Sequence, residues 1–88
     1  MKIKEGFVLR EVMGNFVAVA VGEASKSFRG MIKLNSTAAH IWRGVESGLS
    51  ESEICISLCE NYEVDENTAA KDVRRTLEML EKQGFLEV

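Results

Sequence analysis

Apolar and alternating runs fill the first third of the chain and predict a small β-sheet. The runs 7–12 and 16–21 are rich in β-forming residues, and Met13-Gly14-Asn15 between them favours a turn because glycine and asparagine tolerate positive φ. We therefore expect a hairpin, then a polar connector over 22–27 and a third strand over 28–34. In that third strand, alternation places Phe28, Gly30, Ile32 and Leu34 on one face and Arg29, Met31 and Lys33 on the other.

The rest of the chain predicts three helices, which are recognised by their first residues. Asn35 or Ser36 caps the first helix, and Ser50 begins the second through a capping box with Glu53. Asp65 caps the third and longest helix. The expected helices cover about residues 36–47, 51–62 and 66–83.

The third helix has one clear apolar stripe and one apolar residue outside it. At about 100° per residue, the predicted buried stripe consists of Ala69, Val73, Leu77 and Leu80. Met79 lies about 120° from Val73, on a face that should be wet. It is therefore either a scattered surface methionine or part of a contact surface, for which a flexible thioether is suited.

Together these elements predict an α+β fold. An N-terminal three-stranded antiparallel sheet over 1–34 precedes a three-helix, winged-helix-like bundle over 35–88, and residues 85–88 form an extended tail that packs back on the core. A chain of 88 residues is expected to form a single domain.

Composition indicates an ordinary soluble protein, with 45% hydrophobic and 28% charged residues. No apolar run approaches the roughly 18–20 residues of a membrane span, and the first residues lack the apolar region of a secretion signal, so we expect a cytoplasmic location and no membrane partner. Two cysteines are too few for a disulfide scaffold.

The sequence offers no convincing set of reacting side chains. Cys55 and Cys59 lack the further ligands that a metal site needs, so we expect them to act as small hydrophobic residues. His40 is the single histidine and has no carboxylate or nucleophile at a recognisable spacing. We therefore expect a protein that is not an enzyme and holds no metal or cofactor.

A sheet with three helices also resembles a winged helix-turn-helix, which makes a DNA-binding regulatory module the alternative. DNA affinity comes mainly from Lys and Arg that neutralise phosphates. The formal net charge of the chain is −3. Basic and acidic residues balance in the third helix, and the second carries Glu51, Glu53 and Glu60 without a basic residue. These charges argue against nucleic acid as a partner.

An ordered set of short motifs resembles the PqqD family. The set begins with Leu34-Asn35-Ser36-Thr37-Ala38-Ala39-His40-Ile41-Trp42, then Gly48 and Ser50-Glu51-Ser52-Glu53-Ile54. It continues with Tyr62-Glu63-Val64-Asp65 and Asp72-Val73, and ends with Leu77, Leu80, Gly84, Phe85 and Leu86. The resemblance covers about residues 30–86, whereas the N-terminal hairpin matches only in type.

The resemblance implies a peptide-recognition element of a pathway that modifies ribosomally made peptides. Such domains bind the leader of a precursor peptide as an added strand and present it to a modifying enzyme, often a radical-SAM protein, as in pyrroloquinoline quinone biosynthesis. Carried onto this chain, the cleft lies between the third strand and the third helix.

An exposed strand edge independently fits this mode, because its unpaired N–H and C=O groups can accept an extended peptide. The same edge also leaves open a homodimer or a purely structural subunit. The expected peptide contacts are Arg29, Met31, Ile32, Lys33, Leu34, Asp72, Arg75, Thr76 and Met79.

Overall fold

The computed structural model describes residues 1–27 and 31–87 of the chain. Its main sheet is antiparallel, with the strand order β2-β3-β4, and consists of β2 (Phe7–Val12), β3 (Asn15–Ala20) and β4 (Met31–Leu34). The predicted hairpin is therefore confirmed. The third strand was expected over 28–34, of which Phe28, Arg29 and Gly30 lie outside the described residues.

The hairpin turn differs from the prediction by one residue. Val12 pairs with Asn15, so the loop consists of Met13 and Gly14, which both have positive φ (52° and 81°). Two positive φ values in a two-residue loop match the right-handed twist of the flanking strands. Asn15 begins β3, and Met13 takes the left-handed conformation that the sequence favoured for asparagine.

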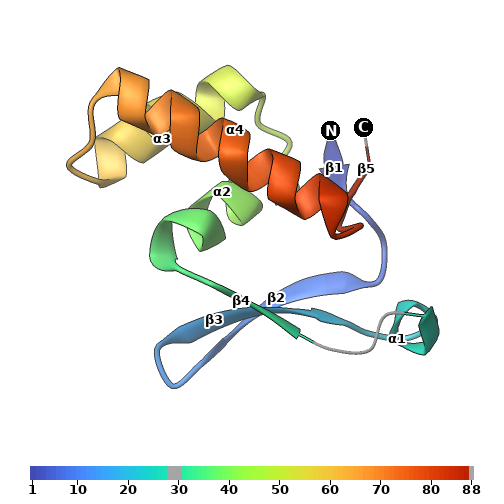
Figure 1. The fold of residues 1–88 in the computed structure, drawn as a ribbon. Coiled ribbons are helices and arrows are strands. Elements are labelled where there is room, and N and C mark those ends of the chain that lie inside the picture. Colours follow the sequence, from blue (N-terminus) through green and yellow to red (C-terminus); the bar gives the residue numbers. More distant parts are fainter. Residues whose placement is uncertain (28–30, 88) are drawn as a thin grey trace.

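The three main helices lie together on one side of the sheet (Figure 1). They are α2 (Ser36–Glu46), α3 (Glu51–Asn61) and α4 (Glu66–Lys82). Asn35, Ser50 and Asp65 are the N-caps, and each side-chain oxygen accepts from the backbone N–H three residues further on, at 2.8, 3.2 and 2.7 Å. Glu53 completes the capping box. The α+β class is thus confirmed, and the helices start where local capping chemistry predicts.

Two short elements depart from the sequence analysis. The polar connector contains a single helical turn, α1 (Ala24–Ser27). The residues near both ends of the chain form a second, two-stranded sheet, in which β1 (Lys2–Ile3) pairs antiparallel with β5 (Leu86–Glu87). The tail does pack back on the core, since Phe85 and Leu86 are both buried.

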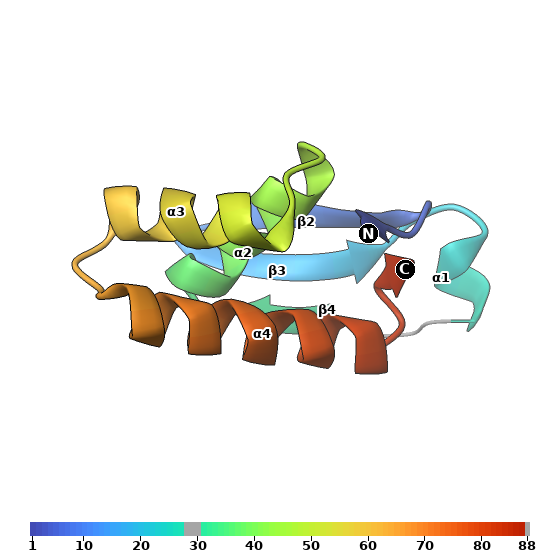
Figure 2. The ribbon, with the colours of Figure 1, turned by 90° about the horizontal axis from the view of Figure 1, so that it is seen from above.

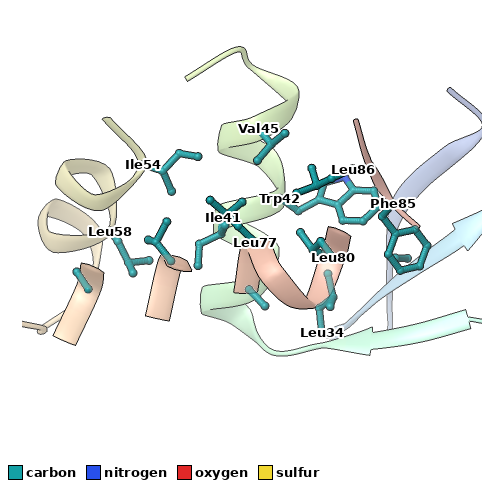
Figure 3. Close-up of a cluster of buried hydrophobic side chains, with 14 residues drawn as sticks. Leu34, Ile41, Trp42, Val45, Ile54, Leu58, Leu77, Leu80, Phe85 and Leu86 are labelled. Atoms are coloured by element: carbon teal, nitrogen blue, oxygen red, sulfur yellow. The ribbon is translucent and has the colours of Figure 1, made fainter. Parts of the chain in front are cut away.

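One buried cluster joins the sheet to the helices (Figure 3). Trp42 of α2 contacts Phe85 edge to face, with ring centroids 5.5 Å apart, and Phe85 contacts Phe7 of β2 in the same manner at 4.9 Å. The predicted stripe of α4 is buried as expected and consists of Ala69, Val73, Leu77 and Leu80. Edge-to-face aromatic contacts add specific geometry to the burial of apolar area.

We expect Leu77→Ala to lower the free energy of unfolding by about 2–5 kcal/mol, because the truncation leaves a cavity beneath α4. Urea denaturation followed by circular dichroism measures this loss. Glu78→Ala, at the exposed neighbouring position, is the control and should change stability by less than about 0.5 kcal/mol. Equal losses in the two variants would show that the buried face of α4 is assigned wrongly.

The cap of α4 also makes stability depend on pH. The hydrogen bond from the Thr68 backbone N–H holds the pKa of Asp65 below its ordinary value. A carboxyl group with a lowered pKa in the folded state stabilises the fold above its unfolded pKa, and this contribution disappears as the pH falls through the folded pKa.

We therefore expect Asp65→Asn to reduce the loss of thermal stability on acidification, since asparagine also caps but does not titrate. Thermal melts across the acidic range measure this dependence. Glu63→Gln, which removes an exposed carboxylate outside the cap, is the control. The role of Asp65 would be refuted by parallel acid profiles for wild type and Asp65→Asn.

Candidate functional site

Strand β4 lies at the edge of the described part of the main sheet. One side of it pairs with β3, from Met31 opposite Val19 to Leu34 opposite Phe16. No described strand pairs with the other side. Seen from above, α4 runs along this side of the sheet (Figure 2). The open edge and the helix together flank a groove.

The groove has a volume of about 330 Å³ and is built by three elements. Strand β4 contributes Lys33 and Leu34, and α4 contributes one face of its middle turns. The start of α2 closes one end. The complete lining is Lys33, Leu34, Asn35, Thr37, Ala38, Asp72, Arg75, Thr76 and Met79.

Most residues expected from the sequence are therefore brought to one place. Lys33 and Leu34 from the strand and Asp72, Arg75, Thr76 and Met79 from the helix all line the groove. Ile32 is on the same strand, but its side chain packs against the core. Met31 is 67% exposed and is not part of the lining, and Arg29 lies outside the described residues.

The sequence did not reveal that the start of α2 also lines the groove. The Asn35 carboxamide oxygen accepts from the Thr37 hydroxyl at 2.9 Å as well as from the Ala38 backbone N–H. The cap thereby holds Thr37 and Ala38 at the end of the groove. The capping signal at Asn35 was readable from the sequence, but the proximity of this cap to α4 depends on tertiary packing.

A second hollow of about 540 Å³ continues along α4 toward its C-terminal end. It shares Arg75 and Met79 with the groove and adds Glu78, Glu81, Lys82 and Gln83. Met79 is half-buried, packs against the core cluster and lines both hollows. Met79 lies outside the buried stripe, as the sequence predicts, and borders both the core and this surface.

Charges of both signs lie along the groove. Lys33 comes from β4, whereas Asp72 and Arg75 come from successive turns of α4. Within the described residues, none of the three forms an ion pair. By contrast, Arg74 on the neighbouring face of α4 pairs with Glu51 of α3. The charges of the groove are therefore available to a bound molecule.

Two other clusters contain side chains that can take part in reactions. His40 Nε2 lies 2.8 Å from the Ser57 hydroxyl oxygen, a partner that the sequence did not reveal, and its ring meets Tyr62 edge to face. No carboxylate among the described residues hydrogen-bonds His40, so a Ser-His-acid triad is not formed. The hydrogen bond between His40 and Ser57 instead links α2 to α3.

The cysteines lie on α3 as free thiols. Burial raises the pKa of Cys55, and the Glu51 carboxylate and Cys59 raise it further, so the thiol stays protonated at neutral pH. In residues 1–27 and 31–87, no three His, Cys, Asp or Glu side chains come together to hold a metal ion. Nor does any helix in these segments have the length and apolar character needed to cross a membrane.

The sequence and the fold of the chain are similar to those of known proteins. The family described as "Coenzyme PQQ synthesis protein D (PqqD)" matches residues 17–86. The chain belongs to the PqqD family. The matched segment begins in β3 and contains β4 and the three main helices, so every residue that lines the groove lies inside the PqqD region.

Two solved structures resemble this PqqD-family chain over nearly its whole length. One is "TbiB1 in Complex with the TbiA(beta) Leader Peptide", with a TM-score of 0.80 and 26% identity over 99% of this chain and 95% of that chain. The other is "Lasso peptide synthetase B1 complexed with the leader peptide", with a TM-score of 0.77 and 20% identity over 96% and 93%, a likeness that concerns the fold alone. None of the curated proteins compared with the chain matches it.

Proposed function

We propose that this PqqD-family chain binds the leader segment of a ribosomally made precursor peptide by strand addition at β4. The observation that carries the proposal is the groove between an open strand edge and α4. Support also comes from the match to TbiB1, whose structure contains a leader peptide. The chain acts as a recognition element and leaves the chemistry to a modifying enzyme.

Strand addition uses the backbone for affinity and side chains for selection. An extended leader would pair with the free N–H and C=O groups of β4, and alternate side chains of the leader would point toward α4. Met79 then offers an apolar contact on the groove floor. The proposed contacts are Arg29, Met31, Ile32, Lys33, Leu34, Asp72, Arg75, Thr76 and Met79.

The unpaired charges select the register of the leader. Arg75 would pair with an acidic leader residue, and Asp72 with a basic one. A leader that slipped by one residue would turn its groove-facing side chains to the opposite face. The groove thus fixes which leader residues face α4, and the backbone pairing holds them there.

The partner that receives the leader is a modifying enzyme, and we propose one of the radical-SAM class, as in pyrroloquinoline quinone biosynthesis. Delivery requires that binding of the leader leave free the segment of the precursor peptide that the enzyme modifies. An open groove on the surface satisfies this condition, because only the paired leader segment is held and the remainder of the precursor can extend away.

The first test concerns Met79. We expect Met79→Gln to weaken binding of a synthetic leader by about 1–3 kcal/mol, which is about 5- to 150-fold. The leader sequence is that of a precursor peptide identified by co-purification with this chain. Isothermal titration measures the affinity, and circular dichroism confirms the fold. Lys71→Gln, an exposed position of α4 outside the groove, should bind like wild type. Unchanged affinity in Met79→Gln would place the leader elsewhere.

The second test separates strand addition from DNA binding. Affinity that arises from backbone hydrogen bonds and apolar contacts should change little between low and high salt. Binding to duplex DNA should fall by orders of magnitude over the same range, because it depends on release of counterions. Titrations of the leader and of a random DNA duplex at several salt concentrations make this comparison. A steep salt dependence for the leader would contradict the proposed mode.

A further inference from the structure

The face of the main sheet turned away from the helices carries several apolar side chains, although no described helix covers it. Side chains on the inner face, such as Phe7, Leu9 and Ile32, pack against the core. The alternate positions point outward, and α2, α3 and α4 all lie on the other side (Figure 1). We call this the outer face; it consists of Val8, Arg10, Val12, Asn15, Val17, Val19, Met31 and Lys33.

The strand register arranges these side chains in rows across the three strands. Val8 is opposite Val19, which is opposite Met31, so one row is entirely apolar. Met31 in this row is 67% exposed, and Val12, at the hairpin end of the sheet, is 53% exposed. Val8, Val17 and Val19 are half-buried. An antiparallel sheet with one solvated face ordinarily carries polar residues on that face, so outward valines on two adjacent strands favour an interaction surface.

The charges of the outer face indicate what kind of partner covers it. In the second row, Arg10 and Lys33 lie on either side of Val17, and none of the described outward positions is acidic. A second copy stacked face to face would bring these cations close to their own copies, which is unfavourable. A protein surface that is apolar at its centre and carries carboxylates around it fits the face.

The outer face is continuous with the proposed leader site. A leader added as a strand next to β4 extends the sheet by one strand. Because side chains alternate along a strand, every second leader residue would then lie on the outer face, beside Met31 and Lys33. The bound leader and the outer face would form one surface.

We propose that the outer face is the docking surface for the modifying enzyme, and that the bound leader completes it. This inference rests on the proposed function. The enzyme presents apolar side chains to the valine and methionine row and carboxylates to Arg10 and Lys33. Since the enzyme touches the leader as well as the sheet, leader and enzyme each raise the affinity of the chain for the other by the same factor.

The precursor peptide and the modifying enzyme are first identified by co-purification with this chain. The test then uses that enzyme and a synthetic leader with the precursor's sequence. Biolayer interferometry measures affinity for the enzyme with and without leader, and isothermal titration measures affinity for the leader alone. We expect the leader to strengthen enzyme binding by about fivefold or more. Arg10→Glu should weaken enzyme binding by about tenfold or more, while leader affinity stays within about twofold of wild type.

Two further variants control for charge and folding. Lys71→Glu makes the same charge reversal on an exposed part of α4 and should leave enzyme binding unchanged. The double variant Val17→Thr/Val19→Thr keeps β-branched side chains, so the sheet should form while the outer face becomes more polar. We expect this variant to lose enzyme binding as Arg10→Glu does, with normal binding of the leader.

The outcomes keep the two proposals apart. If the leader does not bind, the proposed function is refuted. If enzyme binding in that case still depends on Arg10 and the valines, the outer face remains the docking surface, but the leader does not complete it. If leader binds at β4 while the enzyme ignores both outer-face variants, docking on the outer face is refuted. A wild-type dimer in sedimentation that Val17→Thr/Val19→Thr dissociates would also refute it, because a second copy would then cover the face.

Discussion

The aromatic contacts of Phe85 hold together parts of the chain that are far apart in sequence. This ring meets Trp42 of α2 on one side and Phe7 of β2 on the other, at the point where α4 has just ended. The contacts therefore fix the end of α4 over the sheet. The groove depends on this anchoring, because its width is the separation between α4 and the free edge of β4.

The periodicity of α4 explains why one helix can serve both core and groove. Its buried stripe, represented by Val73 and Leu77, faces the interior. Asp72, Thr76 and Met79 are on an adjacent face of the helix and line the groove. A helix of this kind couples stability to recognition, since a rotation that exposed the stripe would also remove the groove.

Local signals in the sequence predicted the fold better than they predicted the exact lining of the site. Caps at Asn35, Ser50 and Asp65 act within one helical turn, so the helix starts were readable. The pairing of β1 with β5 joins opposite ends of the chain, and no local pattern encodes it. The place of Thr37 in the groove and the partner of His40 likewise arise from tertiary packing. By contrast, the helical angle of Met79 was enough to place it outside the buried stripe of α4.

The β1–β5 pair brings both ends of the described chain side by side (Figure 1). Lys2 is opposite Glu87, and the Lys2 Nζ lies 3.5 Å from a carboxylate oxygen of Glu87. A unit whose ends meet in this way can be spliced into a surface loop of another protein with little distortion of either partner. It can equally be linked through either end. The fold can therefore be joined to other domains without rearrangement. In a fusion with a catalytic domain, the two domains would no longer need to meet by diffusion, because the linker keeps each at a high effective concentration near the other.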